Sequence, residues 1–135
     1  MRPTTFLTCV LTACVLTLTA CGAGDADVPP LPEEPTPADA TVFTARTGLL
    51  DPQPVAVTSW SPVADDRIAV HFQTGTPECY GVDATVTETT TSVSVSLLGG
   101  MLPEAEGQMC IMVAVDGVLE VPLQSPLAER TVTTG

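Results

Sequence analysis

Lysine is absent from this chain of 135 residues, which carries four arginines against 16 aspartates and glutamates, a formal net charge of −12 at pH 7. If residues 1–20 are removed as an export signal, Arg2 is lost and the charge becomes 3 − 16 = −13. A chain this acidic repels phosphate, which excludes nucleic acid as a partner and electrostatic docking on anionic lipid headgroups. The carboxylates are scattered and form no D-x-[DN]-x-[DN]-G calcium loop, so we interpret the charge as a means of solubility.

Motifs of catalysis are also missing. His71 is the only histidine, and a general base or a metal ligand needs partner groups that no spacing in the sequence supplies. The alternation of the chain places His71 on the strand face opposite Ile68, Val70 and Phe72, where we expect it to be solvated. The serines lack a G-x-S-x-G elbow and the cysteines lack C-x-x-C spacing. We therefore predict that the protein is not an enzyme and holds no cofactor.

Long hydrophobic runs are confined to the N-terminus, where Phe6–Leu18 follows a single positive charge at Arg2. This apolar run is shorter than the ~20 residues that a transmembrane helix needs, and its ending in small residues is typical of an export signal. The string Leu18-Thr19-Ala20-Cys21 has the residue types of a lipobox, after which the cysteine is lipidated. The sequence predicts a lipoprotein signal peptide over residues 1–20 and a palmitate-bearing diacylglyceryl group on Cys21.

The same L-T-A-C string occurs seven residues earlier and ends at Cys14. Cleavage there would leave only about eight apolar residues before the cut. It would also expose Val15-Leu16 at the new N-terminus, whereas Cys21 is followed by the polar Gly22–Asp25. We favour Cys21 as the lipidation site, and a membrane-anchoring helix with an incidental cysteine is the alternative. Two or more acyl chains hold a protein stably on a membrane, so we expect attachment to the extracytoplasmic face of the cell membrane.

The next segment is rich in proline and acid, with five prolines and five Asp or Glu residues between Gly22 and Ala40. Only Val28 and Leu31 are sizeable apolar residues there, so the segment cannot bury enough surface to fold by itself. Its prolines favour an extended polyproline II conformation of ~3.1 Å per residue. We predict an acidic tether over residues 21–40, with a PxxP ligand as the less favoured alternative, and a folded domain over residues 41–135.

From Thr41 onward the hydrophobic period is two, which indicates β-strands, and no segment has the 3.6-residue period of a helix. Seven to eight short strands favour an all-β fold, an antiparallel β-sandwich of Ig-like architecture, with a small closed barrel as the alternative. Met109–Val115 is apolar on both faces and is predicted as a central strand covered on each side. Asp116-Gly117 is predicted as a type I′ hairpin turn that leads into Val118–Leu123.

The five cysteines divide into a processed set and a remaining pair. Cys9 and Cys14 leave with the signal peptide and Cys21 takes the lipid, so Cys79 and Cys110 remain. An exported domain lies outside the reducing cytoplasm, where two remaining cysteines most simply form one disulfide. Metal ligation by this pair is the alternative, but no histidine or third cysteine accompanies either residue.

Soft ligands and large aromatics are few. Met101, Met109 and Met112 suggest copper, because thioethers are soft ligands, but two of them lie in or next to the apolar Met109–Val115 segment. We therefore favour packing in the core for these methionines. Tyr80 follows Cys79 directly, and it either belongs to a binding surface or covers the disulfide.

Several segments resemble secreted lipoproteins of actinobacteria, the high-GC Gram-positive bacteria. They are Arg67–Phe72 continuing to Cys79, Thr85–Thr89, the Val93/Val95 strand, Cys110 before an apolar run, and the ending Pro126–Val132. Those proteins have a small disulfide-bonded β domain and a P-L-G-x-R-x-V ending, in which this chain has Ala128 in place of glycine, so the turn before Arg130 is expected to differ. The resemblance covers roughly Ile68 to Val132. It implies an envelope location and the disulfide, and it carries no catalytic residues.

These observations lead to two functional hypotheses of different classes. The first is a lipid-anchored, non-enzymatic module that presents a β-sandwich to an envelope protein or ligand whose identity the sequence does not give. The alternative is a small-molecule or metal carrier, with its site formed by the Met101–Met112 loop, His71 and Tyr80. An exposed apolar patch would favour the first hypothesis and a deep pocket with converging polar groups the second.

Overall fold

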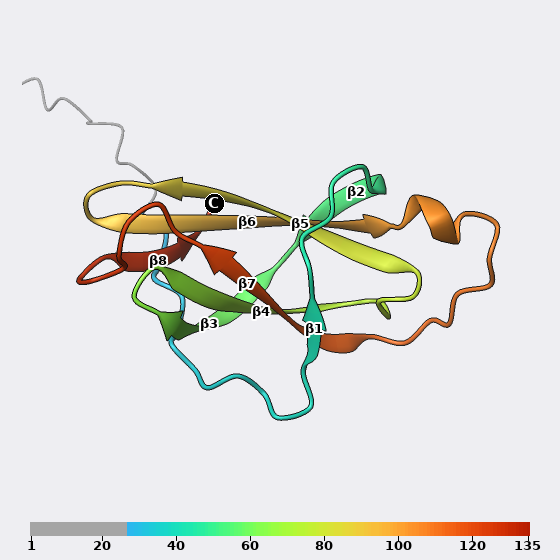
Figure 1. Cartoon of the computed structure of the whole chain (residues 1–135), viewed down its shortest axis with the longest axis horizontal. Helices are drawn as coiled ribbons and strands as arrows, with labels where there is room; N and C mark the ends of the chain where they lie inside the picture. The colour runs from blue at the N-terminus through green and yellow to red at the C-terminus, as the bar shows by residue number, and fades with distance from the viewer. Residues whose placement is uncertain (1–26) are drawn as a thin grey trace, which may run out of the picture.

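The computed structural model describes residues 27–135, and the predictions on the signal peptide, Cys14 and Cys21 lie outside this range (Figure 1). The described chain is all β, with eight short strands and one 3-10 helix, η1, which confirms the predicted class and strand number. No helix within residues 27–135 is long and apolar enough to cross a membrane. The elements are β1 (Thr41–Phe43), β2 (Leu50–Val55), β3 (Val57–Ala64), β4 (Arg67–Thr74), β5 (Tyr80–Glu88), β6 (Ser92–Met101), η1 (Pro103–Ala105), β7 (Val115–Pro122) and β8 (Thr131–Thr134).

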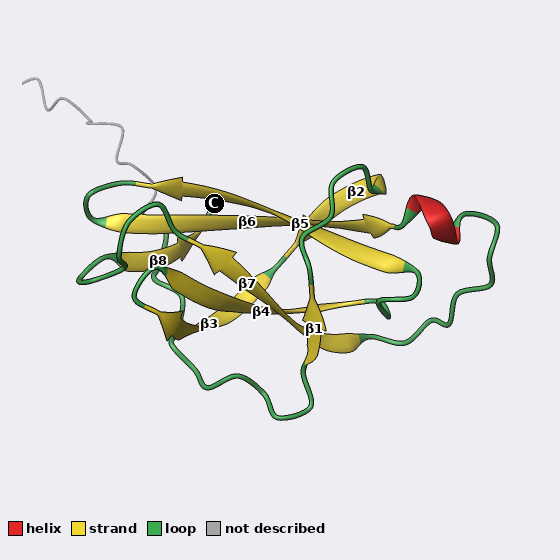
Figure 2. Cartoon of the chain, viewed as in Figure 1, coloured by secondary structure: helices red, strands yellow, loops and turns green. Residues whose placement is uncertain are grey.

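The strands form two sheets that lie over one another as layers (Figures 1 and 2). One sheet has the order β1-β7-β4-β3, and in the other β6 pairs with β5, β2 and β8. The pairs β1–β7 and β6–β8 are parallel, so the sheets are mixed and the prediction of a purely antiparallel arrangement is wrong for these two pairs. Parallel neighbours need long connections, and a period of two along one strand carries no information about which distant strand it pairs with.

The core lies between the two sheets and has the composition that the alternation predicts. Ile68, Val70 and Phe72 of β4 are almost fully buried, and they face a second group that includes Val82 and Val95 from the other sheet. The ring of Phe72 packs against Phe43 of β1 with centroids 5.5 Å apart. Burying such side chains contributes ~1.5–3 kcal/mol each, so this layer is the main source of stability.

The predicted central strand over Met109–Val115 is wrong. Strand β7 begins only at Val115, which pairs with Thr74, the last residue of β4. Beyond Thr74 the β4 chain turns away, so residues 109–114 have no neighbouring strand to complete a ladder and run as a loop.

The predicted hairpin turn at Asp116-Gly117 is also wrong, because both residues lie inside β7. Gly117 pairs with Phe72, and a Cβ at this position would come within 2.5 Å of the Phe72 ring. Glycine is therefore placed here by the close approach of an aromatic ring and not by a turn.

Residues 30–36, which we call the N-terminal strap, run along the domain. The amide of Leu31 donates to the carbonyl of Val132 in β8 at 2.8 Å. The amide of Trp60 in β3 donates to the carbonyl of Pro32 at 3.0 Å, and Glu34 donates to the carbonyl of Trp60 at 2.8 Å. The strap thus joins the edges of both sheets, so these residues of the predicted tether have backbone partners on the domain.

Candidate functional site

The predicted disulfide is present between Cys79 and Cys110, whose Cα atoms are 6.0 Å apart. Cys79 is buried in a small second cluster with Leu102 and Ala105, separate from the core between the sheets. Tyr80 and Met101 pack against this cluster. The disulfide therefore attaches the chain after η1 to a rigid part of the fold, where β5 begins.

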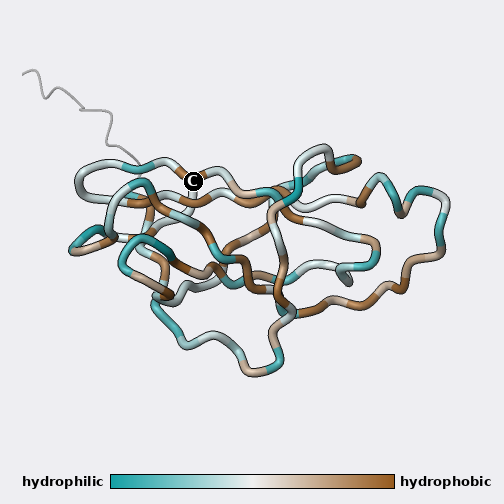
Figure 3. The backbone as a smooth tube through the Cα atoms, viewed as in Figure 1, coloured by the Kyte–Doolittle hydropathy of each residue, from teal (hydrophilic) through white to brown (hydrophobic). Residues whose placement is uncertain are grey.

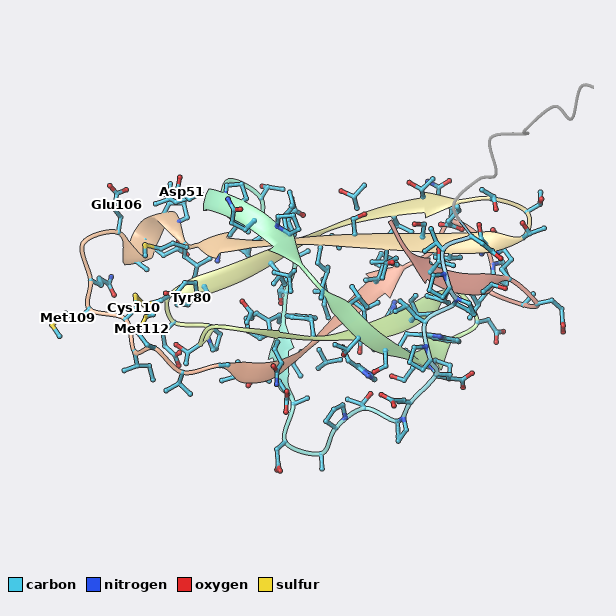
Figure 4. All side chains as sticks on the ribbon, turned by 180° about the vertical axis from the view of Figure 1, so that it is seen from behind. Asp51, Tyr80, Glu106, Met109, Cys110 and Met112 are labelled. Carbon is cyan, nitrogen blue, oxygen red and sulfur yellow. A yellow bond between two sulfur atoms is a disulfide. The ribbon has the colours of Figure 1, made fainter. Side chains whose placement is uncertain are left out.

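Residues 106–114, which we call the disulfide loop, expose four large apolar side chains. Met109 is 101% exposed, Met112 91%, Ile111 63% and Val113 53%. Figure 3 shows the apolar part of this loop as a brown, hydrophobic segment outside the sheets, and Figure 4 shows Met109 at the end of the molecule. The predicted core packing of Met109 and Met112 is wrong. These four neighbouring side chains form the exposed apolar patch of this end of the domain.

The disulfide is the principal tie of this loop. Among the described residues, no loop or turn backbone hydrogen bond involves residues 109–114. The earlier part of the loop is better held, since the amide of Gln108 donates to the carbonyl of Ala105 at 3.0 Å and its side-chain Nε2 donates to the carbonyl of Glu104 at 2.8 Å. The exposed apolar segment is therefore anchored at Cys110 and at Val115 and is unsupported in between.

Tyr80 lies at the base of the disulfide loop, between two hollows of the surface. The larger hollow, about 520 Å³, is lined by Tyr80 together with Asp51, Gln53 and Glu106, among others. The smaller one, about 300 Å³, is lined by Tyr80 and by the apolar part of the loop. The ring of Tyr80 lies against Gly75, where any Cβ would collide with it. The sequence left two roles open for Tyr80; the ring packs on the cysteine cluster and also lines a surface hollow, and a role in binding stays a prediction.

The surroundings of the loop are acidic. Figure 4 places Asp51 and Glu106 at the same end of the molecule as Met109 and Met112. Glu104 accepts a hydrogen bond from Arg46, between Oε1 and Nη2 at 2.6 Å. A backbone hydrogen bond and this arginine hold the pKa of Glu104 below its usual value. In the described part of the chain all three arginines are in ion pairs with glutamates, so the loop has no unpaired arginine beside it.

The prediction that His71 is solvated is wrong. Its side chain is 4% exposed, and both ring nitrogens have hydroxyl partners, with Nδ1 2.9 Å from Ser59 Oγ and Nε2 3.1 Å from Ser61 Oγ. Burial lowers the pKa of His71, and the carboxylate of Glu34 opposes this effect. Thr36 of the strap lies 2.9 Å from Ser61, which in turn contacts the ring, a relation between distant segments that the local pattern cannot show. The available signal was the alternation of Ser59 and Ser61 around Trp60.

The carrier site suggested by the sequence does not assemble. His71 belongs to the polar contacts under the strap, whereas Tyr80 and Met112 line the hollow beside the disulfide loop. Within residues 27–135, no three His, Cys, Asp or Glu side chains are grouped so that they could hold a metal ion. Every buried side-chain nitrogen or oxygen in this range has a hydrogen-bond partner.

Comparison with protein-family models, with curated proteins and with solved structures finds no match to this chain.

Proposed function

We propose that this chain is a lipid-anchored, non-enzymatic binding module of the cell envelope, and that the disulfide loop is the surface with which it contacts a protein partner. The observation that carries the proposal is the exposure of Met109, Ile111, Met112 and Val113 in one loop held by the Cys79–Cys110 bridge. A covalently restrained loop loses less conformational freedom on binding than a free one, which favours affinity.

The chemistry of the loop defines the kind of partner. Apolar side chains contribute ~25 cal/mol per Å² of surface removed from water, so a partner must offer an apolar depression for them. The carboxylates of Asp51, Glu104 and Glu106 around the loop favour a partner with lysines or arginines at the rim of that depression. The same carboxylates oppose insertion of the loop into an anionic membrane.

The membrane attachment rests on the sequence. The lipobox that ends at Cys21, the apolar run before it and the resemblance to actinobacterial lipoproteins support an extracytoplasmic lipoprotein. Substitution Cys21→Ser is expected to abolish metabolic labelling with palmitate and to move the protein from the detergent phase to the aqueous phase. Substitution Cys14→Ser is the matched control and is expected to leave both readouts unchanged. Detergent partitioning that survives Cys21→Ser contradicts the lipid anchor.

The arrangement of the two sheets also bears on the choice between a β-sandwich and a closed barrel. Two sheets that enclose one apolar core support a sandwich of Ig-like architecture over a closed barrel. A barrel has no free sheet edges, whereas here the strap runs along β3 and β8 at the edges of two separate sheets. An experimental structure in which one continuous ladder of strands closes on itself would contradict this assignment.

The binding surface is tested by site-specific photocrosslinking in intact cells. A photoreactive residue at Ile111 is expected to form a discrete protein adduct, and the same residue at Val42, which is 73% exposed but lies on β1, is expected to form none. The wild-type protein, added in excess, is expected to suppress formation of this adduct by competing for the partner. The variant with serine at Met109, Ile111, Met112 and Val113 is expected to compete at least tenfold less well. Equal crosslinking from Val42, or equal competition by the variant, contradicts the proposal.

A further inference from the structure

The strap is held on the domain by side chains as well as by the main chain. The indole Nε1 of Trp60 donates to the carbonyl of Leu31 at 3.2 Å. At the other end of the strap, the hydroxyl of Thr36 lies 2.9 Å from that of Ser61. Leu31 also packs against the main core. The strap is thus a folded element that is joined to the domain at both of its ends.

A chain of hydrogen bonds leads from the strap to a buried imidazole. Thr36 contacts Ser61, Ser61 contacts Nε2 of His71, and Ser59 contacts Nδ1. A neutral imidazole donates from one nitrogen and accepts at the other, and a serine hydroxyl can serve either nitrogen. Both nitrogens of the neutral ring are therefore satisfied, and the ring is buried next to Ser61, the residue that the strap contacts.

The groups that face His71 include no hydrogen-bonded counterion. Strand β3 offers only the two serine hydroxyls, and the residue opposite His71 on β7 is Val118. Asp116 and Glu120 lie two residues to either side on that face of β7, but they are bonded to Gln73 and Arg67 of β4. The strap contributes Glu34, which favours the imidazolium through space without a hydrogen bond to the ring. A proton on His71 would therefore place a poorly solvated charge beneath the docked strap.

We propose that the N-terminal strap is an acid-released latch, in which protonation of His71 favours detachment of residues 30–36 from the edges of β3 and β8. Detachment gives the imidazolium access to water and uncovers the β3 edge for another strand. It also frees seven residues of chain, about 22 Å at the rise of polyproline II. If the chain is lipid-anchored through Cys21 as proposed, the domain then moves away from the membrane in acid.

The dependence on pH follows from linkage. In the detached state the imidazole is solvated and titrates near its usual pKa of about 6.5. In the docked state burial lowers the pKa of His71. Between these two values the detached state binds the extra proton, so the equilibrium constant for detachment rises about tenfold for each pH unit of acidification. Above about pH 6.5 protonation of His71 no longer changes the equilibrium constant for detachment.

The proposal is tested on the full chain by amide hydrogen exchange and tryptophan fluorescence between pH 7.5 and 5. Trp60 is the only tryptophan and its indole contacts the strap, so its emission reports on the docked state. The protection factors of the Leu31 and Glu34 amides, corrected for intrinsic exchange, are expected to fall by up to tenfold per pH unit below about pH 6.5. The amides of Val70 and Leu119 in the core are expected to change little over the same range.

Three variants separate the latch from a purely structural role. His71→Gln keeps a donor and an acceptor but cannot be protonated, so strap protection is expected to become independent of pH. Glu34→Gln removes the group that favours the imidazolium, so the midpoint of the fall is expected to move to lower pH. Thr36→Val removes the strap hydroxyl, and protection is expected to fall several-fold at every pH with the slope unchanged.

Two results would overturn the latch. One is strap protection in the wild-type protein that does not depend on pH between 7.5 and 5. The other is a fall in protection that remains in His71→Gln with the same slope. If His71→Gln does not fold, the NMR titration of the wild-type imidazole decides, because the latch requires the ring to take up its proton within the pH range over which the strap amides lose protection.

Discussion

Four of the described residues have a positive φ, namely Gly48, Asp51, Gly107 and Ala128, and the last two of these lie in turns. Gly107, at the start of the disulfide loop, has φ of 79°, and a Cβ there would meet open space. Ala128, in the turn before Arg130, has φ of 46°. A left-handed conformation costs an L-residue ~1–2 kcal/mol relative to its usual regions. Because the lipoproteins that this chain resembles have glycine here, we expected the turn to differ in this chain. The backbone at Ala128 nevertheless lies in the region that glycine favours.

Substitution Ala128→Gly is expected to raise the free energy of unfolding by about 0.5–1 kcal/mol, because relief of the strain exceeds the added entropy of the unfolded glycine. Urea denaturation monitored by Trp60 fluorescence measures the change. Gly107→Ala is the mirror control and is expected to lower the free energy of unfolding by about 1 kcal/mol. A loss of stability in Ala128→Gly would show that the turn is not strained.

Gly75 is required by the position of Tyr80. A Cβ at residue 75 would overlap the tyrosine ring, so Gly75→Ala is expected to displace the ring and to lower the free energy of unfolding by about 1–3 kcal/mol. Tyr80 is the only tyrosine, and the near-ultraviolet circular dichroism of this residue reports on the displacement. Gly48→Ala, whose Cβ would meet open space although φ is 73°, is the control for the tyrosine signal alone and is expected to leave that signal unchanged.

At the scale of elements, the disulfide loop and the strap are both segments outside the regular strands, and they are attached to the domain by different interactions. The strap completes its hydrogen bonds on the free edges of β3 and β8, which also protects those edges from pairing with other chains. The disulfide loop has no such edge beside it and depends on the bond from Cys110 to the buried Cys79. Order in this loop should therefore be lost when the bond is removed.

The double substitution Cys79→Ser, Cys110→Ser opens a loop of 31 residues and is expected to lower the free energy of unfolding by roughly 3–4 kcal/mol. Amide exchange of residues 109–114 is expected to approach that of an unfolded chain, while β4 and β7 keep their protection at low denaturant. Reduction of the wild-type protein is the matched control and should reproduce both effects. Unchanged exchange in the loop would mean that packing, and not the disulfide, orders it.

The molecule as a whole is acidic, and its few cations are used in ion pairs. Arg130 is the most enclosed of them, since its side chain is 8% exposed and its Nη1 lies 2.8 Å from Oε2 of Glu88. The same arginine donates to the carbonyls of Ser125 and Pro126. It thus fastens the β5–β6 turn to the segment before β8. A backbone hydrogen bond from Gln124 and a side-chain hydrogen bond from Arg130 lower the pKa of Glu88.

Stability is expected to decline in acid in two windows. The pKa of His71 is lower in the folded state than in the unfolded state, so its contribution is complete above about pH 6.5 and is lost as the pH falls through the folded value. The pKa of Glu88 is also lowered, so its contribution is present above about pH 4.5 and is lost as the pH falls further. Urea midpoints measured from pH 8 to 3 should show both declines. His71→Gln should remove the first and leave the second.

Several features of the fold and one part of the site were predictable from the sequence. The alternation around Val70 and Val95 identified buried strand faces, because side chains of a strand alternate in direction whatever its partners are. The pairing of Cys79 with Cys110 followed from elimination among five cysteines. The exposure of the disulfide loop was not predicted, because an apolar run has the same sequence pattern whether other strands cover it or solvent surrounds it.

The sequence by itself determined the all-β class, the strand faces and the disulfide, since these depend on local period and on the number of cysteines. Tertiary structure alone decided that Met109 and residues 111–113 are exposed, that His71 is buried and that the strap lies on the edges of two sheets. These features depend on contacts between residues far apart in the chain, such as Thr36 with Ser61 and Cys79 with Cys110. Whether a polar or apolar side chain meets water is fixed by which distant segment covers it.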